Sequence, residues 1–330
     1  MHDFHTHFIP NDVLNWLKEN KQAVNAEWIK KENNKEDFLF INQKWGFELK
    51  KAFTDFDLYM HDQEKANVTH SMISAIPQLF LYDFPLDITK EMSRIYNQSL
   101  AQLIAVNPGK LSAVGTVPLA HPNKAAEVLN EAMNIGLKGA IIGPGIEQHM
   151  LSDDFFRPFF EEANRLKSVI FIHPLLCEDP RLKRRTMPNL IGVPWETTVC
   201  ATDVLLSGMI DRYPDVKILF AHGGGFLPYQ IGRLDKGYEQ WELVSSNLQA
   251  LPSEYLSRFW YDTVLWNQDS VDFLVKTVGE DRVVAGSDYP FDLCVWPPKE
   301  MSDKGAEPFV FKSISNVKIP LTKQTNYTII

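Results

Sequence analysis

The sequence is poor in cysteine and contains no long apolar run. Its three cysteines, Cys177, Cys200 and Cys294, are widely spaced among 330 residues and form no Cys-x-x-Cys pair. An odd number of scattered cysteines argues against a disulfide framework and fits a reducing compartment, so we expect a cytoplasmic protein. No apolar run approaches the roughly 20 residues of a membrane span, and the first residues lack the basic and apolar regions of a signal peptide.

The chain also lacks a surplus of positive charge. It has 33 lysines and arginines against 42 aspartates and glutamates, which gives a formal net charge of -9 at pH 7. This balance argues against nucleic acid or an anionic membrane as the main partner. A small anionic substrate would therefore need positive charge placed locally at its binding site.

No glycine-rich dinucleotide fingerprint follows the first apolar segment, which weakens the case for an open, doubly wound sheet. Short apolar runs instead alternate with longer amphipathic ones. Such alternation predicts parallel strands joined by helices, and eight strands favour an α/β fold of the closed (β/α)8, or TIM, barrel type. We expect strands at residues 3–7, 71–76, 112–118, 139–142, 169–173, 217–222, 259–263 and 283–287, and helices at residues 57–67, 87–107, 124–135, 154–167, 197–212 and 270–278.

Residues 11–51 do not follow this alternation. The segment is polar and charged but contains three tryptophans, Trp16, Trp28 and Trp45. We expect a small cap inserted after the first strand, with a short helix and a hairpin at residues 38–48; a disordered loop is the alternative. No linker or change of composition divides the rest, so residues 1–330 are expected to form a single domain.

Five polar residues stand where predicted strands end. His5 and His7 are two residues apart, so in a strand both point to the same side. His173, His222 and Asp288 end the fifth, sixth and eighth strands. Working residues of such barrels lie at the carboxyl ends of the strands, and imidazole with carboxylate suits zinc, with manganese or iron also possible. The pattern predicts a metal site, although each residue alone could be structural and Asp288 could cap a helix.

The other histidines lack this arrangement, because they begin strands or lie in helices and loops. They are His2, His61, His70, His121 and His149. A two-metal site would commonly use a lysine at the end of the fourth strand, modified to a bridging carbamate. That end holds residues 142–143, and Lys138 precedes the strand. We therefore expect one metal ion.

Several motifs carry a resemblance to a known family. They are Asp-Phe-His-Thr-His at 3–7, Phe-Ile-His-Pro at 171–174, Val-Pro-Trp-Glu-Thr-Thr at 193–198, Phe-Ala-His-Gly-Gly-Gly-Phe-Leu-Pro-Tyr-Gln-Ile-Gly-Arg at 220–233, and Gly-Ser-Asp-Tyr-Pro-Phe at 286–291. From residue 1 to about residue 295, the chain resembles the decarboxylase branch of the amidohydrolase superfamily (amidohydrolase 2), which aminocarboxymuconate semialdehyde decarboxylase typifies.

The resemblance implies a barrel with one divalent ion, zinc or alternatively manganese. Its ligands would be His5, His7, His173 and Asp288. His222 would lie near the metal-bound water as an acid/base or polarising group. The resemblance also implies that Arg233 binds a substrate carboxylate by reaching into the site of a partner subunit, and therefore that the protein is a homodimer.

The function expected on this basis is metal-dependent, non-oxidative decarboxylation of a carboxylated aromatic or muconate-type acid. His222 or Asp288 would deliver the proton that replaces carbon dioxide. A hydrolase or hydratase acting on a lactone, amide or conjugated acid would use the same residues. A purely structural zinc site, closed by four ligands, is a third reading, but it leaves His222 without a role.

The chain also departs from those relatives. Residues 57–62 contain no substrate-binding arginine, residues 264–267 contain no histidine, and residues 313–330 do not resemble the usual closing helix. A different substrate is therefore expected.

Overall fold

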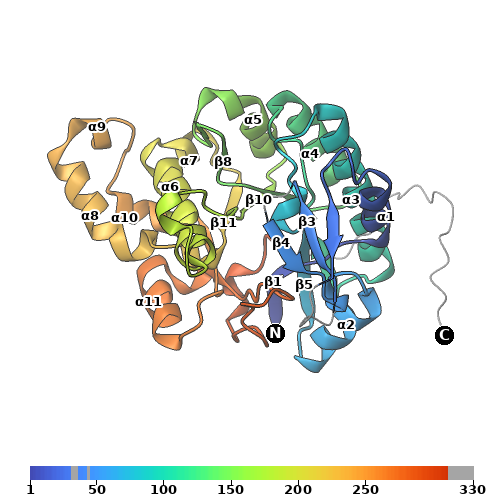
Figure 1. Ribbon diagram of the computed structural model, residues 1–330. Coiled ribbons are helices and arrows are strands. Elements are labelled where there is room, and N and C mark those ends of the chain that lie inside the picture. Colours follow the sequence, from blue (N-terminus) through green and yellow to red (C-terminus); the bar gives the residue numbers. More distant parts are fainter. Residues whose placement is uncertain (31–35, 43–44, 311–330) are drawn as a thin grey trace.

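Eight parallel strands form the centre of the part of the chain that the structure describes, residues 1–30, 36–42 and 45–310 of a computed structural model (Figure 1). Each lies close to a predicted strand, although most are shorter. They are β1 (His2–His7), β5 (His70–Ser74), β6 (Leu111–Ala113), β7 (Gly139–Ile142), β10 (Val169–Ile172), β11 (Lys217–Phe220), β12 (Trp260–Asp262) and β13 (Val283–Val284).

The strands form two sheets that join at both edges. One sheet has the order β1-β5-β6 and the other β13-β12-β11-β10-β7. Phe4 N donates to Ala285 O at 2.8 Å on one side, and Gly115 N donates to Gly139 O at 2.9 Å on the other. Parallel bridges at the same two places complete the ring. The prediction of a (β/α)8 barrel is confirmed.

Helices surround the ring (Figure 1). They are α2 (Phe56–Lys65), α3 (Leu86–Val106), α4 (Pro122–Asn134), α5 (Arg157–Arg165), α6 (Val193–Leu206), α7 (Met209–Arg212), α8 (Leu227–Gln240), α9 (Glu242–Ser245), α10 (Pro252–Tyr255) and α11 (Gln268–Val278). The helix predicted at 197–212 is two helices, because Gly208 between them has φ +66°. Helices α8 to α10, which project from one side of the barrel in Figure 1, were not predicted.

The described part of the inserted segment is folded. Helix α1 (Asn11–Glu19) is followed by an antiparallel sheet of β2 (Glu27–Ile29), β3 (Phe38–Ile41) and β4 (Trp45–Glu48). The predicted hairpin is β3–β4, and β2 is an additional strand. The cap contacts the loop after β13, since Phe47 packs against Phe291 at 5.9 Å between ring centroids and Lys50 Nζ lies 2.7 Å from Asp292 Oδ1.

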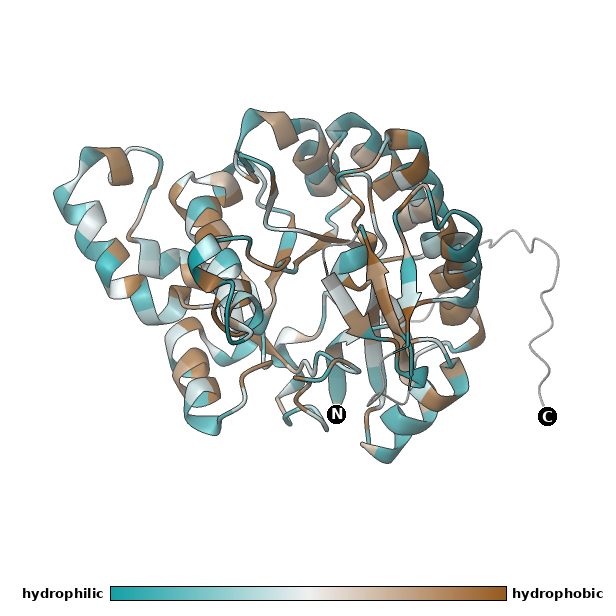
Figure 2. Cartoon of the chain, viewed as in Figure 1, coloured by the Kyte–Doolittle hydropathy of each residue, from teal (hydrophilic) through white to brown (hydrophobic). Residues whose placement is uncertain are grey.

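The barrel strands are almost entirely buried, as is typical when both faces of a parallel sheet are covered. Figure 2 shows mixed hydropathy along the surrounding helices and a hydrophilic β1 at the N-terminus, which carries the two histidines. None of the helices described here has the length and apolar character needed to cross a membrane. Two small hairpin strands, β8 (Gly145–Ile146) and β9 (His149–Met150), follow β7. The predicted irregularity at 313–330 lies outside the described residues.

Candidate metal centre

The five residues predicted at strand ends all lie at the carboxyl end of the barrel. His5 and His7 are in β1. His173 comes directly after β10, His222 two residues after β11 and Asp288 four residues after β13. The last three therefore follow their strands instead of ending them, because the strands are shorter than predicted. His5, His7 and His173 are at most 4% exposed, so an ordinary solvated histidine is excluded.

Unusual backbone angles direct two of these side chains into the centre. His222 has φ +55° and Asp288 φ +64°, a left-handed conformation that is costly for residues with a Cβ. Gly286 fits a close approach, since a Cβ there would lie 2.9 Å from the Cβ atoms of both His5 and Asp262. The chain is thus held in a strained shape that brings His222 and Asp288 toward His5.

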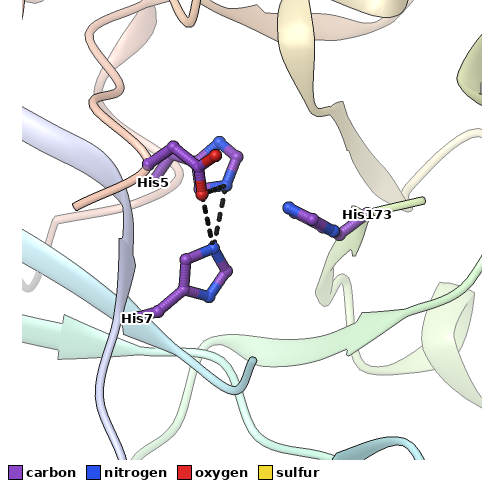
Figure 3. Close-up of side chains that lie close together, drawn as sticks. His5, His7 and His173 are labelled. Atoms are coloured by element: carbon purple, nitrogen blue, oxygen red, sulfur yellow. Dashed lines mark hydrogen bonds and ion pairs between the residues drawn. The ribbon is translucent and has the colours of Figure 1, made fainter. Parts of the chain in front are cut away.

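Four polar atoms converge on one point. His5 Nε2 lies 3.1 Å from His7 Nε2 and 3.3 Å from Asp288 Oδ1, and His7 Nε2 lies 3.0 Å from the same oxygen. His173 faces this group from the opposite side (Figure 3). One ligand atom from each of His5, His7, His173 and Asp288 lies within 4.8 Å of the others.

The hydrogen bonds on the far side of each ring determine which nitrogen faces the centre. Carbonyl and carboxylate oxygens only accept, so each Nδ1 must donate: His5 to Asp262 Oδ2 at 2.6 Å, His7 to Ala75 O at 2.9 Å, and His173 to Pro174 O at 2.9 Å. The Nε2 atoms are then available to the centre, and His173 Nε2 is buried without any partner among the described residues.

These residues fit a divalent ion. Three imidazole nitrogens and one carboxylate oxygen form a ligand set for zinc or manganese. The separations of 3.0 to 3.3 Å among the His5, His7 and Asp288 atoms are close to the ~3.3 Å edge of a tetrahedron with ligand bonds of about 2.0–2.1 Å. A divalent ion here would accept the lone pairs of these three nitrogens and one carboxylate oxygen, which lie too close together to be stable without positive charge between them.

The electrostatics of the metal-free centre also favour a cation. Burial disfavours the protonated ring of His5, but the carboxylates of Asp262 and Asp288 outweigh it and raise its pKa to about 10. Burial alone would raise the pKa of Asp288, yet the positive charge on His5 and interactions with the rings of His222 and His7 hold it well below the usual value. Burial lowers the pKa of His7, and that of His173 far more. One positive charge is therefore held at the centre.

His222 lies beside the four converging residues. Its Nε2 is 3.7 Å from Asp288 Oδ2, and its ring centroid is 5.2 Å from that of His173. Its Nδ1 is buried without a hydrogen-bond partner in the described part of the chain. His222 can therefore exchange a proton with Asp288 or with a molecule bound next to it.

Sequence reasoning missed Asp262. This fully buried carboxylate bonds His5 through Oδ2, while Oδ1 accepts from Gly223 N at 3.1 Å and Val264 N at 3.0 Å. It thereby fixes the ring of His5 and the turn that follows His222. The available signal was an acidic residue within the apolar run of the seventh strand, but the sequence does not reveal its partner.

Arg233 is not brought to the centre of its own chain. It is exposed on α8.

Asp288 begins no helix, so the helix-cap alternative is wrong. His70, at the opposite end of β5, bonds Gly109 O and Ser112 Oγ, which confirms its structural role.

Comparisons with known proteins agree with this architecture. The family described as amidohydrolase matches residues 3–309. The chain belongs to the amidohydrolase family. It is 28% identical over 296 residues to 2-amino-3-carboxymuconate-6-semialdehyde decarboxylase of Dictyostelium discoideum, covering 88% of this chain and 82% of that protein. The similarity therefore extends over nearly the whole barrel.

Solved structures with the same fold include two decarboxylases. The 5-carboxyvanillate decarboxylase of Sphingomonas paucimobilis has a TM-score of 0.73 and 20% identity, and covers 88% of each chain. That of Novosphingobium aromaticivorans, complexed with manganese and 4-hydroxy-3-methoxy-5-nitrobenzoic acid, has a TM-score of 0.76 and 19% identity, covering 93% of this chain and 92% of the other.

Proposed function

We propose that this amidohydrolase is a metal-dependent, non-oxidative decarboxylase of a carboxylated aromatic or muconate-type acid. The observation that carries the proposal is the convergence of three Nε2 atoms and one carboxylate oxygen, with His222 beside them. The decarboxylases among its relatives and structural neighbours support this reaction class over others available to the fold. We assign His5, His7, His173 and Asp288 as ligands of a single ion, zinc in preference to manganese.

The residues around the ion have separate roles in the proposed reaction. A bound divalent ion would act as a Lewis acid that polarises an oxygen of the substrate. Loss of carbon dioxide leaves an electron pair on carbon, which must receive a proton. We assign delivery of that proton to the His222–Asp288 pair, whose Nε2 and Oδ2 atoms are 3.7 Å apart. Asp262 holds the ring of His5 so that its Nε2 keeps facing the centre.

We also propose a homodimer in which Arg233 serves the partner's site. A groove of about 730 Å³ lies between α6 and the start of α8, and its lining includes Trp195, Val199, Phe226 and Tyr229. Tyr229 is 78% exposed and Trp195 48%, an apolar surface that is typical of a protein interface. Arg233 is four residues after Tyr229, so the two lie on the same face of α8. A second copy seated on this face would meet Arg233, whose guanidinium can hold a carboxylate with two hydrogen bonds.

The organisation and location follow the sequence expectations. We propose one domain over residues 1–330, with residues 11–51 as a cap whose β4 and Lys50 lie over the loop after β13. We propose a cytoplasmic location, with a small carboxylate as substrate and with neither nucleic acid nor membrane as a partner.

Isotope labelling distinguishes decarboxylation from hydrolysis or hydration. The metal-loaded protein is incubated with carboxylated aromatic and muconate-type acids in H₂¹⁸O, and both carbon dioxide release and ¹⁸O in the organic product are measured. We expect carbon dioxide equal to the substrate consumed and no ¹⁸O in the product. Incorporation of ¹⁸O without carbon dioxide would establish the hydrolase or hydratase alternative.

A further inference from the structure

The densest group of cations in the sequence lies in the loop that leaves the metal centre. Arg181, Lys183, Arg184 and Arg185 place four positive charges within five residues of a chain whose net charge is -9. Asp179 neutralises Arg181 by accepting from its guanidinium. The remaining three are exposed and form no ion pair with any residue in the described ranges.

The position of this loop connects it with the centre. It begins after His173, which follows β10, and ends at α6. Loops that follow barrel strands lie on the face that holds the converging histidines and Asp288, whereas loops that precede strands lie on the opposite face. The three cations at residues 183–185 therefore belong to a loop on the same face of the barrel as the metal centre.

The loop has a defined shape. Arg184 N donates to Leu182 O at 2.6 Å, and Leu190 N donates to Thr186 O at 3.0 Å. Arg185 and Thr186 have φ of +54° and +57°, which is especially unfavourable for a β-branched residue such as threonine. The surrounding structure must hold these two residues against their own preference, and such strain concentrates at functional positions.

We propose that Lys183, Arg184 and Arg185 form an electrostatic attractor that draws a small organic acid with two or more negative charges to the metal centre. This inference rests on the proposed function. The acidic chain as a whole repels anions, but three cations without ion-pair partners on the carboxyl-end face would make the potential there locally positive. Coulomb energy scales with the charge on the substrate, so a dianion gains more than a monoanion, and salt screens the difference. The substrate class is thereby narrowed to acids that carry a second anionic group.

A triple variant with a matched control tests the attractor. The test protein carries Lys183→Gln, Arg184→Gln and Arg185→Gln. The control carries Lys65→Gln, Lys110→Gln and Lys167→Gln, three exposed lysines just before β5, β6 and β10 at the opposite end of the barrel. Both variants lose three positive charges, but from opposite ends of the barrel; Lys167 lies 4.0 Å from Asp215, an exposed pair that contributes little to stability.

The readout is kcat/KM for a monocarboxylated and a dicarboxylated aromatic acid at ionic strengths of about 0.01 M and 1 M. For the diacid at low salt we expect kcat/KM of the loop variant to fall about 3- to 10-fold through a higher KM, and kcat/KM of the control to fall less than about 2-fold. The monoacid should lose less, and high salt should abolish the difference. Equal losses in both variants, or a loss unaffected by salt, would overturn the proposal.

Binding provides a readout that does not need turnover. The affinity of the metal-loaded proteins for benzene-1,3-dicarboxylate is measured by calorimetry, and the loop variant should bind several-fold more weakly than the control. If the unmodified protein releases no carbon dioxide but the loop variant still binds more weakly than the control, the proposed reaction is wrong and the proposed attractor is supported. If the two variants bind equally, the attractor is refuted whatever the reaction.

Discussion

The hydrogen bond from His5 to Asp262 is the contact outside the ligand set that most directly shapes the metal centre. In the variant Asp262→Asn the side-chain oxygen can still accept from Gly223 N and Val264 N, but the negative charge that orients His5 is lost. We expect metal affinity to fall about 10- to 100-fold. Competition with a chromophoric chelator measures this. Asp62→Asn, which alters a carboxylate bonded to Tyr289, is the control and should bind like the unmodified protein; equal affinities of the two variants would contradict the role of Asp262.

Proton release on metal binding follows from the charge on His5. Without metal its pKa is raised to about 10, so at pH 8 its ring carries the extra proton. An ion can bind Nε2 only after that proton leaves, so binding should release close to one proton and should strengthen as pH rises toward 10. Calorimetry in two buffers with different ionisation enthalpies counts the protons. If the binding enthalpy, corrected only for heats of dilution, is identical in both buffers, no proton is released and the His5 ring is already neutral.

For individual residues, the sequence predicted the candidate metal ligands but not the contacts that orient them. His5 and His7 could be found because two histidines two residues apart share one side of a strand, and His173 because it ends an apolar run. Asp262 could not be assigned, because its partner lies 257 positions away in the chain. The left-handed backbone at His222 and Asp288 depends on tertiary contacts and had no local signal.

At the scale of helices and strands, the alternation of apolar and amphipathic runs predicted all eight barrel strands in the described chain. It did not predict α8. That helix contains Gly232 and Gly237 and exposes apolar side chains such as Tyr229, so its pattern is not that of a helix covering a barrel. An apolar outer face is explained if it lies against a second copy of the chain.

Mixed dimers test whether α8 serves the partner's site. One subunit carries Arg233→Ala and the other His222→Asn, and two affinity tags isolate the mixed species. If Arg233 acts in the partner, one of the two sites has both residues intact, so the mixed dimer should recover about half of the unmodified activity, whereas each variant alone should be at least ~10-fold impaired. A mixed dimer as inactive as its parents would place Arg233 in its own subunit or outside the site.

At the scale of the whole molecule, the barrel has a large core that does not depend on the metal centre. The buried clusters include Phe156, Phe159 and Phe220, none of which is a candidate ligand. The family resemblance and the strand pattern together predicted this architecture, and the cap was predicted only in outline, because a 41-residue insertion of polar and aromatic residues has no regular period.

Chelation of the metal should therefore remove activity without unfolding the protein. We expect an unchanged far-ultraviolet circular dichroism spectrum, with a lower Tm because the stabilisation by a bound ligand is lost. Activity should return when zinc or manganese is added. Loss of the helical signal on chelation would instead support a structural zinc site.

The central claim is that one ion held by His5, His7, His173 and Asp288 supports decarboxylation. The most direct measurement is titration of the metal-free protein with zinc or manganese while the initial rate of carbon dioxide release is recorded, using an acid that the loaded protein decarboxylates. We expect the rate to rise linearly to one ion per chain and then to remain constant, and a His173→Ala variant to stay inactive throughout. A metal-free protein as active as the loaded one, or a rate that rises to a second equivalent, would contradict the account.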